Sequence, residues 1–341
     1  MTALDLFPLT LDNGAAIERL NQLEGAVVCT MPEPWALVAP NVPAPIHLIE
    51  AGSVELDHLR ELATAVPSQA RVVVGLGGGS SIDTAKFVAE ATGLPLYQIP
   101  TIISVDAAFT APYGYRDGAR VRYAGNLRPV EVIADPSLIR LAPPALNRAG
   151  VGDLLSCHTG MFDWRLAVDA GRGDIPWDED AASLGRRVLD DVEGAAREIA
   201  AVSDEGVRFL ARTHQHVGAG CVAYGARFEE GSEHFLAYCF EWLTQEHRVH
   251  GELISFCVLV MSYVQGNDPD RAIRIVRESG VDARPSHLGI DGGLLRRMLV
   301  ELPAYCEREE LWPSVVETVD LTEELADLAF AHARAGARDD G

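Results

Sequence analysis

Two kinds of hydrophobic pattern divide this chain and constrain its fold more than any other feature. Between residues 26 and 139, short apolar runs alternate with turn residues, and residues 54–65 and 81–91 have helical spacing. The predicted strands are AVVCT, IHLIE, RVVVGL, LPLYQI and VEVIAD. Apolar strands that alternate with helices are typical of a parallel sheet covered on both faces. We therefore predict an α/β N-terminal domain with a mainly parallel, Rossmann-like sheet.

The second half of the chain has helical periodicity almost throughout. From about residue 146 onward, the pattern is interrupted only by polar breaks near residues 171–179, 225–231 and 266–269. The paired prolines of LAPPALN, at residues 141–147, mark the expected boundary. The sequence thus predicts an α/β domain at residues 1–145 and an all-α domain at residues 146–341.

Charge and composition exclude several classes of partner. The 341 residues include 28 basic and 50 acidic side chains, a formal net charge of −22, which repels phosphate backbones and anionic lipids. We expect neither nucleic acid nor membrane as a partner. The start MTALDLFPLT lacks the pattern of a signal peptide, so we expect a cytoplasmic protein. The six cysteines form no CxxC pair, which favours reduced core thiols.

Lys86 is the only lysine of the chain, and the other 27 basic residues are arginines. An isolated lysine suggests a place where a guanidinium is too large or has the wrong shape. The alternative interpretation is that Lys86 lies on a helix surface and remains there by chance.

The stretch RVVVGLGGGSSIDTAKFVAEATG carries a glycine-rich turn between a strand and a helix. Glycines allow close approach of a ligand to the backbone, and a helix N-terminus attracts phosphate. Residue 80 is Ser80, so the turn does not match GxGxxG, and it lacks the GK[ST] of a P-loop. A structural turn without ligand is the alternative interpretation.

Five blocks of sequence, in order over residues 70–265, resemble one family. They are GGGSSIDTAK, PTIISVD, AGVGDLLSCHTGMFDW, GSEHFLAYCFEW and HGE. Together they resemble the glycerol-1-phosphate dehydrogenase branch of the iron-containing alcohol dehydrogenase and dehydroquinate synthase superfamily. The resemblance implies a dinucleotide-binding domain at residues 1–145 and a metal-binding and substrate domain at residues 146–341.

A divalent metal is the first cofactor that the resemblance implies. Asp153, His234 and His250 provide one carboxylate and two imidazoles, a set that suits Zn²⁺ or another divalent transition metal. The residues alone do not choose this set, because His247 or the pair His214 and His216 are equally available. The resemblance implies Asp153, His234 and His250, and gives Asp153 a catalytic role.

NAD(H) or NADP(H) is the second implied cofactor. The resemblance places its binding on the glycine-rich turn, the helix that follows and the next loop, at Gly77, Gly78, Gly79, Ser80, Asp83, Lys86, Thr101, Ser104 and Thr110. Asp106 is implied to face the substrate and take part in catalysis. Turn capping is the alternative role for Thr101 and Ser104, and a solvated loop carboxylate is the alternative for Asp106.

Three departures from the family pattern concern the two binding sites. Cys157 stands where the family usually has lysine, and Tyr238 stands where an EHxxSH pattern has its second histidine. Both changes lie on the substrate side and disfavour a small phosphorylated substrate. The third departure is the segment between AVVCT and IHLIE, whose 15 residues include five prolines and leave room for a helix only at residues 34–38. This predicts a shortened adenosine pocket.

The sequence therefore predicts a metal-dependent, NAD(P)-linked oxidoreductase. It would transfer hydride between nicotinamide and a polyol or hydroxy-ketone, resembling sn-glycerol-1-phosphate dehydrogenase with an altered substrate pocket. A dehydroquinate-synthase-like cyclase or lyase that uses NAD transiently is one alternative, and a non-catalytic relative is another. A small-molecule substrate and a homo-oligomer are expected.

Overall fold

The protein, seen in a computed structural model, is described here for residues 4–42, 47–118, 120–173 and 175–338. Its chain forms two compact units. The α/β unit comprises residues 5–147 together with residues 202–219, and the helical unit comprises residues 1–4, 148–201 and 220–341. The α/β unit thus takes the first part of a later helix in addition to the N-terminal segment that the sequence suggested.

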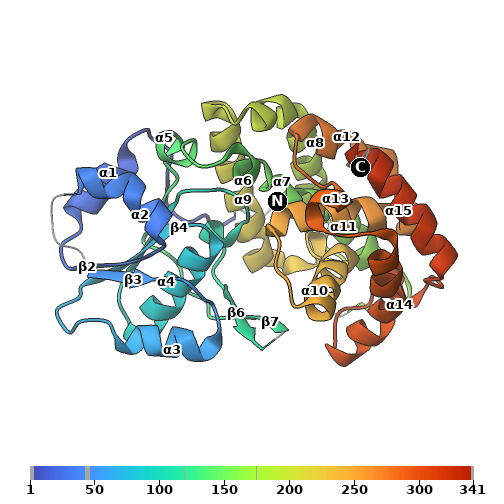
Figure 1. The fold of residues 1–341 in the computed structure, drawn as a ribbon, viewed down its shortest axis with the longest axis horizontal. Helices are drawn as coiled ribbons and strands as arrows, with labels where there is room; N and C mark the ends of the chain where they lie inside the picture. Colours follow the sequence, from blue (N-terminus) through green and yellow to red (C-terminus); the bar gives the residue numbers. More distant parts are fainter. Residues whose placement is uncertain (1–3, 43–46, 119, 174, 339–341) are drawn as a thin grey trace. The chain divides into compact units, whose positions relative to one another are not determined.

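A six-stranded sheet with strand order β1-β8-β5-β4-β2-β3 forms the centre of the α/β unit (Figure 1). Its strands are β1 (Leu9–Thr10), β2 (Ala26–Thr30), β3 (His47–Glu50), β4 (Val72–Gly77), β5 (Leu96–Pro100) and β8 (Glu131–Ile133). Every neighbouring pair is parallel, which confirms the predicted architecture. The sequence analysis missed the two-residue strand β1 and the separate antiparallel hairpin of β6 (Tyr113–Asp117) and β7 (Arg120–Ala124).

Helices cover both faces of this sheet (Figure 1). Val72, Val74 and Leu76 of β4 point to one face, where they join a core with α1 (Ala15–Gln22) and α2 (Pro32–Val38). Val73 points to the opposite face and packs with α3 (Leu56–Thr64) and α4 (Gly79–Thr92). Burial on both faces explains why the strand reads as a continuous apolar run.

The proline-rich connection from β2 to β3 contains a short helix, as expected. The helix begins at Pro32 rather than at residue 34. The N–H groups of the first helical turn have no partner within the helix, so a proline, which lacks this group, is tolerated there. A 3₁₀ turn, η1 (Ala39–Asn41), follows directly. The last three residues of this connection, 43–45, and the first residue of the expected strand IHLIE lie outside the described residues.

Helices account for the second half of the chain. After α5 (Pro136–Ile139), they are α6 (Pro144–Arg148), α7 (Val151–Asp169), α8 (Glu179–Ala201), α9 (Asp204–Tyr224), α10 (Ser232–Thr244), α11 (His250–Gln265), α12 (Pro269–Ser279), α13 (Pro285–Leu288), α14 (Gly292–Arg308) and α15 (Glu323–Ala337). Three 3₁₀ turns, η2 (Ala107–Phe109), η3 (Ala226–Phe228) and η4 (Val315–Glu317), complete the elements. Within the described residues, none of the helices combines the length and apolar character needed to cross a bilayer.

Helix α11 is the centre of the helical unit. Its residues 251–262 are all buried, which an apolar helix requires when it is surrounded by others. Helices α7, α10, α12 and α15 pack around it. The six cysteines are free thiols, five of them buried, which confirms their predicted role as small core residues.

Candidate metal and nucleotide sites

Asp153, His234 and His250 come together in the helical unit. Asp153 lies in the first turn of α7, His234 near the start of α10, and His250 is the first residue of α11. One ligand atom from each lies within 4.8 Å of the other two. His250 Nε2 is 3.4 Å from Asp153 Oδ1. Metal–ligand bonds of about 2.1 Å at tetrahedral angles put donor atoms roughly 3.4 Å apart, so the Asp153–His250 pair has the spacing of two ligands on one ion.

Gly152 allows α7 to approach the start of α11 beside these ligands. Gly152 precedes Asp153, and Gly251 follows His250. A Cβ added to Gly152 would lie 2.3 Å from the carbonyl oxygen of Gly251, a distance that no side chain permits. The contact therefore depends on glycine, and it places the Asp153 carboxylate against the His250 imidazole.

Glu233 orients His234. Its Oε1 lies 2.8 Å from His234 Nδ1 and also accepts the backbone N–H of Gly231 at 2.7 Å. A proton on Nδ1 leaves the Nε2 lone pair available for a metal. Although burial lowers the pKa of His234, the hydrogen bond to Glu233 and the charges of Glu230, Glu233 and Asp153 raise it to about 10. The group of side chains around His234 therefore carries an excess of negative charge that a divalent cation would offset.

Asp163 fixes the start of α10. It is fully buried on α7, and its two oxygens accept the backbone N–H groups of Ser232 and Val315, each at 2.8 Å. Burial raises its pKa to about 6, against the hydrogen bond from Ser232. The sequence analysis missed Asp163 and Glu233. The adjacent Glu233–His234 pair was the one available signal, whereas nothing local indicates that Asp163 caps a helix 69 residues later.

The alternative histidines do not join a group of three ligands in the described part of the chain. His247 is half exposed and lies 3.5 Å from Glu241. His214 is buried in the α/β unit, where its ring stacks on Phe109 with 6.0 Å between centres. His216 is exposed and bonds the carbonyl of Arg212 at 2.7 Å.

The glycine-rich turn lies at the point where the strand order reverses. Strand β2 connects outward to β3, while β4 connects in the opposite direction to β5. Ligands of open parallel sheets bind outside the carboxyl ends of the strands at such a point. Gly78, Gly79 and Ser80 remain accessible there, and they open helix α4, whose first amides attract phosphate. These residues fit the phosphates of a dinucleotide.

Two of the glycines are also needed for packing, because a side chain at either position would collide with a neighbouring side chain. Gly77 has φ +149°, and a Cβ on it would lie 2.5 Å from Ser81 Oγ. A Cβ on Gly78 would lie 2.7 Å from Ile102 Cδ1. Packing alone therefore explains part of the glycine cluster. Accessibility at Gly79 and Ser80 is the stronger indication of a ligand.

Lys86 is fully buried inside the α/β unit. Its Nζ donates to the Pro112 carbonyl at 2.6 Å and to Thr110 Oγ1 at 3.3 Å, and lies 3.7 Å from Asp83 Oδ1. Burial lowers the pKa of Lys86, while Asp83 and Asp106 raise it. Burial raises the pKa of Asp83 to about 6, with Lys86 opposing the shift. The enclosed amine explains why a guanidinium is not used here.

The remaining residues expected at the nucleotide lie on the loop after β5. Thr101 and Ser104 are buried, and the Thr101 N–H donates to the Gly77 carbonyl at 3.0 Å. Asp106 precedes η2 and is close enough for its charge to act on both Asp83 and Lys86. The loop and the glycine-rich turn therefore form one cluster. Which of these side chains touch a cofactor stays a prediction.

Comparison with known proteins supports the same family. A sequence model of the iron-containing alcohol dehydrogenases matches residues 39–143. Glycerol-1-phosphate dehydrogenase, NAD(P)+, of Hyperthermus butylicus is 32% identical over 255 residues, which are 73% of this chain and 72% of that protein. The protein of the same name from Aeropyrum pernix is 33% identical over 229 residues, 67% of this chain and 64% of that protein.

The chain belongs to the glycerol-1-phosphate dehydrogenase branch of the iron-containing alcohol dehydrogenase family. Solved structures share its fold. A probable glycerol dehydrogenase from Sinorhizobium meliloti has a TM-score of 0.76 at 21% identity and covers 100% of both chains. Glycerol dehydrogenase from Schizosaccharomyces pombe has a TM-score of 0.75 at 16% identity, covering 99% of this chain and 92% of that one.

Two of the departures from the family pattern, Cys157 and Tyr238, each lie one helical turn after a candidate metal ligand. Cys157 is fully buried one turn after Asp153. Burial, and then the charges of Glu229, Glu233 and Asp153, raise the pKa of its thiol well above the usual range. It therefore supplies no charge of either sign. The Tyr238 ring centre lies 6.0 Å from that of His234, one helical turn earlier.

Proposed function

We propose that this protein is a metal-dependent, NAD(P)-linked oxidoreductase that transfers hydride between nicotinamide and a polyol or hydroxy-ketone. Membership of the family and the dehydrogenase names of its relatives support the reaction class. The observation that carries the proposal is the convergence of Asp153, His234 and His250 from three helices.

Asp153, His234 and His250 would hold a divalent ion, which would supply Lewis acidity to a ketone or alcohol oxygen beside a nicotinamide that would exchange the hydride. Around that chemistry, Glu233 holds the proton on His234 Nδ1, and Asp163 fixes the start of α10. The amides that open α4 bind the phosphates of the dinucleotide. Zinc is our choice of metal, because one carboxylate and two imidazoles suit it.

The substrate pocket is proposed to differ from that of a phosphate-specific relative. Cys157 provides an uncharged thiol in a group of carboxylates, and Tyr238 provides an aromatic wall. Because position 157 carries a thiol where the family usually has lysine, a phosphate group would lack a cationic partner there and would bind more weakly. We therefore expect poor turnover of dihydroxyacetone phosphate and better turnover of a bulkier or less charged ketone.

A substrate panel tests this function. Full-length protein with added Zn²⁺ is assayed with simple ketones and ketose phosphates by nicotinamide absorbance. Stoichiometric consumption of NADH or NADPH with a ketone supports the proposal. Product formation without net cofactor change would instead indicate a cyclase or lyase, and no turnover with any compound would contradict the oxidoreductase assignment. Homo-oligomeric assembly and cytoplasmic location stay predictions, to be checked by light scattering and cell fractionation.

A further inference from the structure

A carboxylate and a phenol form a pair beside the candidate metal ligands. The Tyr238 hydroxyl donates to Glu230 Oε1 at 2.9 Å, and both residues are half-buried. Tyr238 follows His234 by one turn of α10, so its ring lies on the same face of the helix as the imidazole. The backbone of Glu230 is held by a hydrogen bond from its N–H to the Ala226 carbonyl at 2.8 Å. The pair is therefore positioned by both main chain and side chain.

The charge around this pair is negative. Glu230, Glu233 and Asp153 all act electrostatically on His234. The only lysine of the chain is Lys86, so residues 148–341 contain none. Two arginines lie close to these residues in the sequence, and each has a hydrogen-bond partner outside this group.

Those two arginines are Arg227 and Arg248. Arg227 donates to the Pro313 carbonyl at 2.8 Å and lies over the Trp312 ring. Arg248 donates to the Leu288 carbonyl at 2.8 Å and pairs with Glu246. A phosphate beside the candidate metal ligands would thus meet carboxylates, while a hydroxyl group would meet a carboxylate and a phenol that can bond it.

We propose that Glu230 and Tyr238 bind hydroxyl groups of an uncharged polyhydroxy-ketone or polyol and discriminate against phosphate esters. The inference rests on the proposed oxidoreductase function and names the substrate class of that site. A carboxylate accepts hydrogen bonds from substrate hydroxyls, whereas it repels an anion at the same position. Tyr238 orients the carboxylate and adds a second hydroxyl partner.

Binding measurements test the pair without relying on turnover. Calorimetry on the full-length, Zn²⁺-loaded protein compares dihydroxyacetone with dihydroxyacetone phosphate in the absence of nicotinamide. We expect the wild type to bind dihydroxyacetone more tightly than its phosphate. Glu230→Gln keeps an oxygen for the Tyr238 hydroxyl but removes the charge, so it should tighten phosphate binding by about tenfold or more and weaken dihydroxyacetone binding several-fold. Tyr238→Phe should weaken dihydroxyacetone binding while keeping the discrimination against phosphate.

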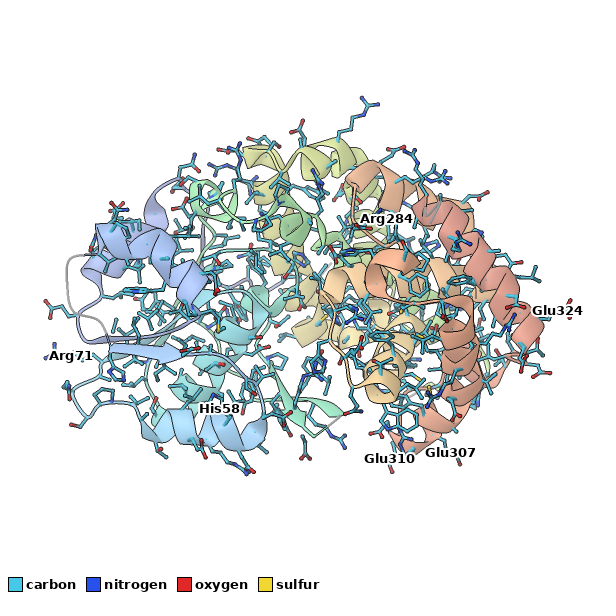
Figure 2. All side chains as sticks on the ribbon, in the orientation of Figure 1. His58, Arg71, Arg284, Glu307, Glu310 and Glu324 are labelled. Carbon is cyan, nitrogen blue, oxygen red and sulfur yellow. The ribbon has the colours of Figure 1, made fainter. Side chains whose placement is uncertain are left out.

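Glu307→Gln is the matched control. Glu307 lies exposed on α14 (Figure 2), so its variant changes the net charge equally and should leave both affinities unchanged. The proposal is overturned if the wild type binds no dihydroxyacetone, if it prefers the phosphate, or if Glu230→Gln changes the affinity ratio no more than Glu307→Gln does. Failure of the oxidoreductase function is a separate result: the affinity ratios hold, but no ketone consumes nicotinamide.

Discussion

Replacing the single lysine tests how the α/β unit is held together. In Lys86→Met, the apolar stem remains, while Asp83, Thr110 Oγ1 and the Pro112 carbonyl lose their cationic partner. The Asp83 side chain is only 17% exposed, so little solvent replaces the interaction. Removing one partner of a buried ion pair costs about 3–5 kcal/mol. We expect the free energy of unfolding to fall by about 3 kcal/mol near pH 8, measured by urea unfolding with far-UV circular dichroism.

The loss of unfolding free energy in Lys86→Met should depend on pH. Burial already raises the pKa of Asp83 to about 6, and Lys86 holds it down. Without Lys86 the pKa of Asp83 rises further. A carboxyl group whose folded-state pKa exceeds its unfolded value destabilises the fold as pH rises through that folded value. The deficit of Lys86→Met should therefore be smaller at pH 5, where Asp83 takes up a proton, than at pH 8.

A surface pair with the same sequence spacing provides the control. Arg60 and Asp57 are also three residues apart, with 2.9 Å between their charged atoms, but both are exposed. Arg60→Met should leave the unfolding midpoint unchanged. Lys86→Arg should also destabilise, because the larger guanidinium overfills an enclosed site. The reasoning is refuted if Lys86→Met unfolds like Arg60→Met, or if its deficit is the same at both pH values.

Three further predictions concern the candidate metal ligands and the residues that support them. Full-length protein should hold about one divalent ion per chain, and His234→Ala or His250→Ala should each lose it; unchanged metal in both variants, by elemental analysis, would contradict the site. Glu233→Gln should weaken Zn²⁺ affinity about 10- to 100-fold in a chelator competition, and equal affinity would show that His234 needs no carboxylate. Gly152→Ala should lose metal and melt at a lower temperature, because its Cβ would lie 2.3 Å from the Gly251 carbonyl oxygen. Gly194→Ala on α8 places its new Cβ more than 4 Å from any atom outside the nearby turns of its own helix and should keep both properties, so equal behaviour of the two alanine variants would refute the close-approach argument.

Local patterns predicted the elements that carry the sites. The apolar run RVVVGL predicted β4, because a strand buried on both faces of a sheet must be apolar throughout. The glycines after it indicated the turn into α4, because a turn that binds phosphate needs accessible backbone amides. Strand β1 was missed because two residues are too few to show a hydrophobic period. The β6–β7 hairpin was also missed, and its two strands pair with each other in a separate sheet.

The choice of metal ligands could not come from periodicity. Ten histidines were available, and residues alone left His247, His214 and His216 as candidates beside His234 and His250. Resemblance to a family selected the set, and the structure brings its three members within 4.8 Å of one another. The physical reason for their meeting is the glycine contact between α7 and α11, which no one-dimensional pattern shows.

The sequence by itself determined the parallel α/β sheet, the helical second half and the glycine-rich turn, because hydrophobic period and turn chemistry are local properties. Only the tertiary structure decided what the polar residues between them do. Lys86 is enclosed by Thr110 and Pro112, and Asp163 caps a helix that begins 69 residues later. Glu230 accepts the hydroxyl of Tyr238. Such partners are selected by packing, which satisfies buried polar groups with whichever residues the fold brings near them.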